Sequence, residues 1–434
     1  MSSSDRASRG RAKWDPLSDE SLAPLREYKY TSVDKSPFSY YVLRPYWNFV
    51  VELLPLWLAP NLVTLLGFMA ILGNVGLLGM YIPDLIGPAS PWLYYSFAAG
   101  VWFYSTMDNI DGKQARRTGT SSPLGELFDH GIDSLNCTLA SLLETAAMGF
   151  GATRPGAFTA LVPCLPMFFS TWETYHTHTL YLGYFNGPTE GLTIAALMMV
   201  FSGYFGPGIW SEPLAGFVPV LGSLLGETTS VKDVWVPFLT IMFLVSHLPA
   251  CIYHVVQARR AKNLPVWTTF LEWFPMGVFW AGCLSWLQSP HSSLLRENHL
   301  ILFCLTMSLV FGRMTTKIIL AHLTRQPFPM WTAMLTPLIA GAAIGNLPLV
   351  GLPPIRPDLE LWYLRAYFLY ASVVYGRWAV LVIEAFCRFL GIKALTVPPE
   401  KVQAAKAKQE SANGYASPPA NRQRSRGSVR RREV

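Results

Sequence analysis

Apolar stretches of about 20 residues recur along most of the chain, and this is the length that a helix needs to cross a hydrocarbon core of roughly 30 Å. Residues 62–81 and 238–256 are two examples. Of the 434 residues 51% are hydrophobic and only 14% are charged, which leaves too little polar surface for a soluble protein of this size. The sequence therefore predicts an all-α integral membrane protein.

About ten transmembrane helices are expected, preceded by an amphipathic helix at 41–58 that lies in the membrane interface, with Trp47 and Trp57 as anchors. The predicted spans are 61–81, 92–109, 126–150, 157–182, 190–206, 234–256, 266–287, 298–318, 330–347 and 361–390. Residues 1–40 are polar. Residues 393–434 form a basic segment that we expect to be a disordered tail and not a nucleic-acid binding domain.

Basic residues in the loops predict the orientation, because short loops rich in Lys and Arg stay in the cytosol. An even number of spans places both termini on one side. Loops on that side hold Lys113, Arg116, Arg117, Arg259, Arg260, Lys262, Lys317 and Arg325, and the opposite loops hold Arg154, Lys232, Arg296 and Arg356. Both termini, and the loop between the second and third spans, are therefore expected in the cytosol.

Carboxylates gather on both sides of that loop. Asp108 and Asp111 lie three residues apart at the end of the second span and so share a helix face. The start of the third span carries Glu126, Asp129, His130 and Asp133 in the same way. A charged side chain costs roughly 2.5–3.5 kcal/mol at the centre of a membrane helix, so these aspartates need a compensating partner.

Divalent cations are the natural partner, because Mg²⁺ and Mn²⁺ prefer hard oxygen ligands. The expected metal ligands are Asp108, Asp111, Asp129 and Asp133. Two ions about 4 Å apart would bridge a diphosphate and take up charge at a reacting phosphorus. A solvated helix end would explain one such aspartate pair, but not two matched pairs on consecutive apolar helices.

The order Asp108, Asp111-Gly112, Ala115-Arg116, Gly125, Asp129, Asp133 resembles the complete signature of the CDP-alcohol phosphotransferases. Five further stretches resemble the eukaryotic choline and ethanolamine phosphotransferases: 28–34 (YKYTSVD), 46–48 (YWN), 59–64 (APNLVT), 172–176 (WETYH) and 181–190 (YLGYFNGPTE). The resemblance extends from about residue 20 to 390.

This resemblance implies transfer of phosphocholine or phosphoethanolamine from CDP-choline or CDP-ethanolamine to diacylglycerol, giving a phospholipid and CMP. Residues 59–210 would form the catalytic helices, and 211–392 would provide lipid access and dimer contacts. The expected substrate-binding residues are Asn61, Thr64, Gly112, Lys113, Ala115 and Arg116. The resemblance also implies a homodimer in the membrane of the endoplasmic reticulum or Golgi.

The general base is expected on one stripe of the third span. The resemblance nominates Asp133, but an aspartate that also binds a metal is a poor base. His130, held in its tautomer by Glu126, is the alternative.

Two other functions fit parts of the pattern. A phosphotransferase with a different alcohol or acceptor would use the same aspartates, and a cation-coupled transporter would also carry intramembrane carboxylates. Gly112 and Arg116 between the aspartate pairs favour a phosphate ligand over a bare ion. The sequence leaves the choice between choline and ethanolamine open.

Overall fold

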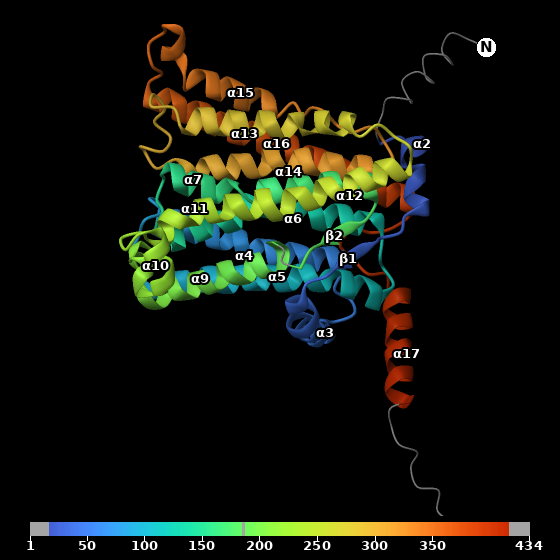
Figure 1. Cartoon of the computed structure of the whole chain (residues 1–434). Coiled ribbons are helices and arrows are strands. Elements are labelled where there is room, and N and C mark those ends of the chain that lie inside the picture. The colour runs from blue at the N-terminus through green and yellow to red at the C-terminus, as the bar shows by residue number, and fades with distance from the viewer. Residues whose placement is uncertain (1–16, 185–186, 416–434) are drawn as a thin grey trace, which may run out of the picture.

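The computed structural model describes residues 17–184 and 187–415, and within them the chain forms a bundle of roughly parallel and antiparallel helices (Figure 1). The bundle helices are α4 (Pro60–Tyr81), α5 (Pro91–Thr118), α6 (Pro123–Ala147), α7 (Arg154–Leu161), α8 (Cys164–Thr177), α9 (Leu192–Phe205), α11 (Val231–Ile241), α12 (Leu248–Ala261), α13 (Phe274–Leu287), α14 (Leu300–Leu323), α15 (Leu335–Ile344) and α16 (Pro357–Leu390). The expected all-helical membrane fold is confirmed.

Short elements connect these helices. They are the helices α2 (Asp19–Leu22) and α10 (Pro219–Leu225), the 3₁₀ turns at Ala23–Glu27, Pro207–Ser211, Leu214–Gly216, Trp267–Trp273 and Leu347–Val350, and the π-helical turns at Ser39–Leu43, Gly187–Gly191 and Met242–His247. Two three-residue strands, β1 (Ser32–Asp34) and β2 (Leu180–Leu182), pair in parallel, with Val33 opposite Tyr181. This pairing ties the N-terminal segment to the chain that follows α8.

Four helices, α4, α5, α6 and α14, pack closely at the centre of the bundle. Small residues allow the approach. A Cβ atom on Gly67 of α4 would lie 2.9 Å from the Cβ of Met107 on α5, and one on Gly131 of α6 would lie 2.9 Å from Thr316 on α14. Because real Cβ contacts are longer, both positions require glycine. The helices that carry the predicted site are therefore held tightly together.

Among the described residues, four helices are long and apolar enough to cross a membrane by length and composition: α4, the continuous helix Val231–Ala261, α14 and α16. Two of the other predicted spans are interrupted or shorter than predicted. Residues 157–182 are divided between α7 and α8, and 330–347 contains only the ten-residue α15, which is about 15 Å long at 1.5 Å per residue. The number of spans stays a prediction.

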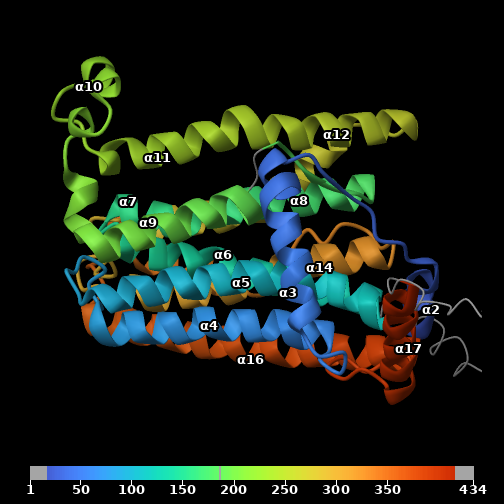
Figure 2. The same cartoon turned by 90° about the horizontal axis from the view of Figure 1, so that it is seen from below.

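The expected interfacial helix at 41–58 is present as α3 (Arg44–Leu53), which follows the π-helical turn and runs across the bundle helices (Figure 2). Trp47 and Val51 are buried against the bundle, while Phe49 and Leu53 are exposed. Such a two-sided helix suits a position at the membrane surface.

Both described ends of the chain, α2 and α17 (Pro399–Tyr415), lie at the same end of the bundle (Figure 1). The expectation of a disordered tail over 393–434 is wrong for Pro399–Tyr415, which is helical because its Ala, Lys, Gln and Glu residues favour helix. Residues 393–398 lead irregularly into this helix, whereas residues 416–434 of the expected tail and residues 1–16 of the polar N-terminal segment lie outside the described residues.

Candidate active site

The site is built on the turn between α5 and α6. Gly119 ends α5 in the left-handed region (φ +64°), where glycine carries no Cβ penalty. Three residues later, the side chain of Ser122 accepts a hydrogen bond from the Gly125 amide, and Pro123 begins α6. This short connection, residues 119–122, sends α6 back along α5 and brings the two halves of the sequence signature face to face.

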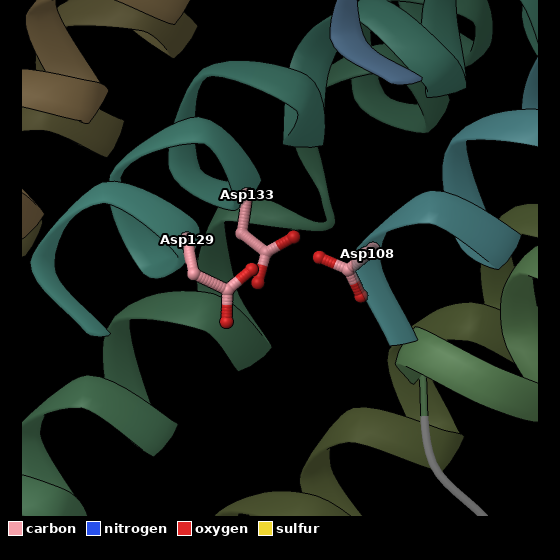
Figure 3. Close-up of side chains that lie close together, drawn as sticks. All are labelled: Asp108, Asp129 and Asp133. Atoms are coloured by element: carbon pink, nitrogen blue, oxygen red, sulfur yellow. The ribbon is translucent and has the colours of Figure 1, made fainter. Parts of the chain in front are cut away.

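Asp108 of α5 and Asp129 and Asp133 of α6 converge between these two helices, so that one carboxylate oxygen from each lies within 4.8 Å of the others (Figure 3). Buried oxygens of Asp108 and Asp129, both Oδ1, have no hydrogen-bond partner among the described residues. A buried carboxylate oxygen without a partner is costly, and three neighbouring carboxylates repel one another. The cluster therefore suits a divalent cation with oxygen ligands.

Asp111, the fourth expected ligand, is not in this group of three. It is buried, and it accepts a hydrogen bond from the hydroxyl of Thr64 on α4. Thr64, which we expected to bind substrate, is therefore positioned to orient the Asp111 carboxylate.

Two tyrosines that the sequence reasoning missed hold carboxylates of the site. The hydroxyl of Tyr104, one turn before Asp108 on α5, donates to Asp133 Oδ1 at 2.5 Å. The hydroxyl of Tyr28, from the N-terminal segment, donates to Glu126 Oε2. Burial and the Glu126 carboxylate raise the pKa of Tyr28, which keeps its hydroxyl protonated and able to donate.

The structure gives the base candidates partners that differ from the predicted ones. Glu126 lies with its Oε1 3.7 Å from His322 Nε2 of α14, in addition to its bond from Tyr28. His130 has its Nε2 4.0 Å from Asp129 Oδ2. The expectation that Glu126 holds His130 in its tautomer is therefore not supported, because Glu126 is engaged by residues that reach it from other elements.

The predicted substrate-binding residues fall into two groups. Gly112, Ala115 and Arg116 lie on the last turns of α5, where Arg116 is exposed. Lys113 instead donates from its Nζ to Asn48 Oδ1 of α3 at 2.7 Å. Asn61, at the start of α4, is buried and donates from its Nδ2 to the carbonyl oxygen of Ala394 at 2.9 Å. Lys113 and Asn61 are thus bound to other parts of this chain.

The two signature glycines are not required by packing of the protein itself. A Cβ atom on Gly112 would meet only Arg116 Nη1, at 3.5 Å, and one on Gly125 would meet only Asn61 Oδ1 and Ser122 Oγ, each at 3.9 Å. These are ordinary contact distances. Because glycine carries no side chain, a ligand could approach the backbone closely at these positions.

Comparison with known proteins indicates the family to which this site belongs. Residues 57–202 match the family model of the CDP-alcohol phosphatidyltransferases. The chain is 35% identical over 396 residues to choline/ethanolaminephosphotransferase 2 of Arabidopsis thaliana. This match covers 86% of this chain and 95% of the relative. It is 36% identical over 319 residues to cholinephosphotransferase 1 of Saccharomyces cerevisiae, covering 72% of this chain and 80% of the relative.

A third relative, ethanolaminephosphotransferase 1 of Mus musculus, is 29% identical over 382 residues, covering 84% of this chain and 91% of the relative. The chain belongs to the CDP-alcohol phosphatidyltransferase family, and it is a membrane-embedded transferase. Within that family, its similarity over most of the chain is to the choline/ethanolaminephosphotransferases. The transporter alternative is not favoured.

Proposed function

We propose that this enzyme transfers phosphocholine, phosphoethanolamine or both from the corresponding CDP-alcohol to diacylglycerol, forming phosphatidylcholine or phosphatidylethanolamine and releasing CMP. The observation that carries the proposal is the convergence of Asp108, Asp129 and Asp133 on two helices whose signature glycines are not required by packing of the chain itself. A diphosphate with bound cations fits this arrangement, because carboxylates hold the cations and bare backbone admits the phosphates. The names of the relatives supply the alcohol. Diacylglycerol as the acceptor rests on the family resemblance.

The proposed reaction is an in-line displacement. The hydroxyl oxygen of diacylglycerol forms a bond to the phosphorus that bears the amino alcohol, and the bond from this phosphorus to the oxygen of CMP breaks. CMP leaves with the electron pair of that bond, and the hydroxyl proton passes to a base. Positioning and charge stabilisation supply most of the rate in such transfers.

Residues of the chain have distinct parts in this scheme. Asp108, Asp129 and Asp133 would hold divalent cations, with Asp111 as a further ligand, and we propose two ions, Mg²⁺ or Mn²⁺. When bound, these ions supply positive charge beside the transferring phosphate. The exposed Arg116 adds fixed positive charge for the departing CMP.

We retain Asp133 as the proposed base, in which case the other three aspartates hold the cations, and we retain His130 as the alternative if Asp133 is itself a ligand. The hydroxyl of Tyr104 fixes the orientation of the Asp133 carboxylate, since it donates to one of its two oxygens. His130 lies one turn nearer the start of α6, beside Asp129. Either side chain therefore lies in or beside the aspartate cluster, where the hydroxyl of diacylglycerol would have to bind.

The proposed location is the endoplasmic reticulum or Golgi membrane, with the active site facing the cytosol and the enzyme acting as a homodimer. The distribution of basic residues in the loops supports this orientation. The organelle and the dimer rest on the family resemblance.

The decisive experiment uses purified protein, diacylglycerol and Mg²⁺ with either CDP-choline or CDP-ethanolamine, and identifies the lipid formed and the CMP released. We expect the phospholipid that corresponds to each accepted CDP-alcohol. CDP-diacylglycerol with inositol or with glycerol 3-phosphate serves as the control reaction and should give no product. Formation of a lipid only in one of these control reactions would refute the proposed substrates while leaving the family chemistry intact.

A further inference from the structure

The segment that follows α16 covers the end of the bundle that holds the aspartate cluster. Gly391 ends α16 in the left-handed region (φ +65°) and the chain then turns back across the bundle toward α17 (Figure 1). Ile392 and Ala394 pack against the hydrophobic cluster that contains Leu124 and Leu127 from the first turns of α6. The segment is thus anchored directly beside the signature helix.

One polar contact of this segment fixes a predicted substrate-binding residue. The Nδ2 of Asn61 donates to the carbonyl oxygen of Ala394 at 2.9 Å, across a sequence separation of 333 residues. Because this bond uses the nitrogen of the amide, the oxygen Oδ1 points elsewhere, and it lies 3.9 Å from the position of a Cβ on Gly125. The main chain at Ala394 therefore sets which end of the Asn61 amide faces the signature glycine.

A second polar contact holds the connection between α5 and α6. The Nζ of Lys401, on the first turn of α17, donates to the carbonyl oxygen of Gly119 at 2.8 Å. The last carbonyls of a helix have no partner within the helix and attract positive charge, so a lysine at this point is stabilising. Lys401 therefore fastens the end of α5 that carries Gly112, Ala115 and Arg116.

We propose that residues 391–402, which we call the C-terminal strap, complete the nucleotide subsite, and that Lys401 is a positioning residue for binding of the CDP-alcohol. This inference rests on the proposed function, since it takes Asn61 and the end of α5 as contacts of the nucleotide. The strap fastens the subsite on two flanks, Asn61 on one and Gly119 on the other. The proposal assigns the strap no contact with diacylglycerol.

A role in nucleotide binding differs from a role in folding alone, because it changes the constants that report nucleotide affinity and leaves the others unchanged. Loss of the Lys401 bond should loosen the end of α5 and raise the KM for the CDP-alcohol about tenfold, the usual order for a hydrogen bond made by a charged donor. The KM for diacylglycerol and the kcat at saturating CDP-alcohol should stay near the wild-type values, and the melting temperature should fall only slightly, because one contact at a helix end contributes little to stability.

The test compares Lys401→Met with Lys401→Arg and with Lys408→Met, measuring both KM values, kcat, inhibition by CMP and thermal melting of each purified protein. Lys408 lies on the same helix and is exposed, so its substitution is the matched control and should behave as wild type. Lys401→Arg keeps a cationic donor and should restore most of the affinity for the CDP-alcohol. The inhibition constant of CMP should rise in Lys401→Met in parallel with the KM.

An unchanged KM for the CDP-alcohol in Lys401→Met would overturn the proposal. A joint loss of kcat, of both affinities and of melting temperature would also overturn it, since that pattern marks a purely structural contact. Failure of the proposed function is a separate result, because wild-type protein would then form no phospholipid from either CDP-alcohol.

Discussion

The bond from Tyr104 to Asp133 gives the sharpest prediction from the structure. Tyr104 is 1% exposed, and its hydroxyl donates to Asp133 Oδ1 at 2.5 Å. The substitution Tyr104→Phe removes this donor and keeps the shape of the ring. We expect a large loss of activity with the fold intact, because the only change is one hydrogen bond to a carboxylate of the site.

The magnitude follows from the kind of bond. A hydrogen bond to a charged group contributes about 1.5–3 kcal/mol. Since each 1.36 kcal/mol corresponds to a factor of ten in rate, full loss of this contribution in the transition state lowers kcat/KM by roughly 10- to 150-fold. If the bond serves substrate and transition state equally, kcat stays unchanged.

Tyr94→Phe is the matched control. Tyr94 is on the same helix, is also 1% exposed, and uses its hydroxyl to accept a hydrogen bond from the Ala89 amide at 3.2 Å, far from the aspartates along α5. The assay is release of CMP from CDP-choline with diacylglycerol, together with thermal melting of both variants. Activity of Tyr104→Phe within twofold of wild type, or an equal loss in Tyr94→Phe, would refute the reasoning.

Three further outcomes are expected. Asp108→Asn should remove activity and metal dependence together while the protein stays folded, because it removes one ligand charge without a change of shape; near-normal turnover at ordinary Mg²⁺ would show that this residue is no ligand. If Asp133 is the base, Asp133→Asn should lose turnover while metal and CDP-alcohol affinities persist, and His130→Ala should retain turnover; loss of metal binding in Asp133→Asn would assign the base to His130. Single cysteines introduced at positions 120 and 415 should both be labelled from outside sealed microsomes, and protection of either would contradict the proposed orientation.

Much of the aspartate cluster could be predicted because its determinants are local. Residues four apart on a helix lie on one face, so Asp129 and Asp133 are expected on the same side of α6. The short break after Thr118 indicates that α6 returns alongside α5, which carries Asp108. Asp111 shows the limit of this reasoning. It shares a face of α5 with Asp108, but the hydroxyl of Thr64 on a neighbouring helix donates to it, and helical spacing alone does not predict that partner.

The partners of the site carboxylates could not be predicted in the same way. Tyr104 is 29 residues from Asp133, and Tyr28 is 98 residues from Glu126. The spacing of Tyr104 and Asp108 on α5 is a weak signal that both face the same neighbour. For Tyr28 the sequence carries no local signal, because its position depends on how the N-terminal segment crosses the end of the bundle.

The sequence by itself determined that this is a helical membrane protein with a cluster of aspartates on two consecutive helices, because hydrophobic length and helical spacing act over a few turns. Only the tertiary structure decided which groups hold those aspartates and that the chain after α16 returns to Asn61 and Gly119. Contacts across hundreds of residues depend on how helices pack. The periodicity of one helix fixes which face it buries but does not specify the element against that face.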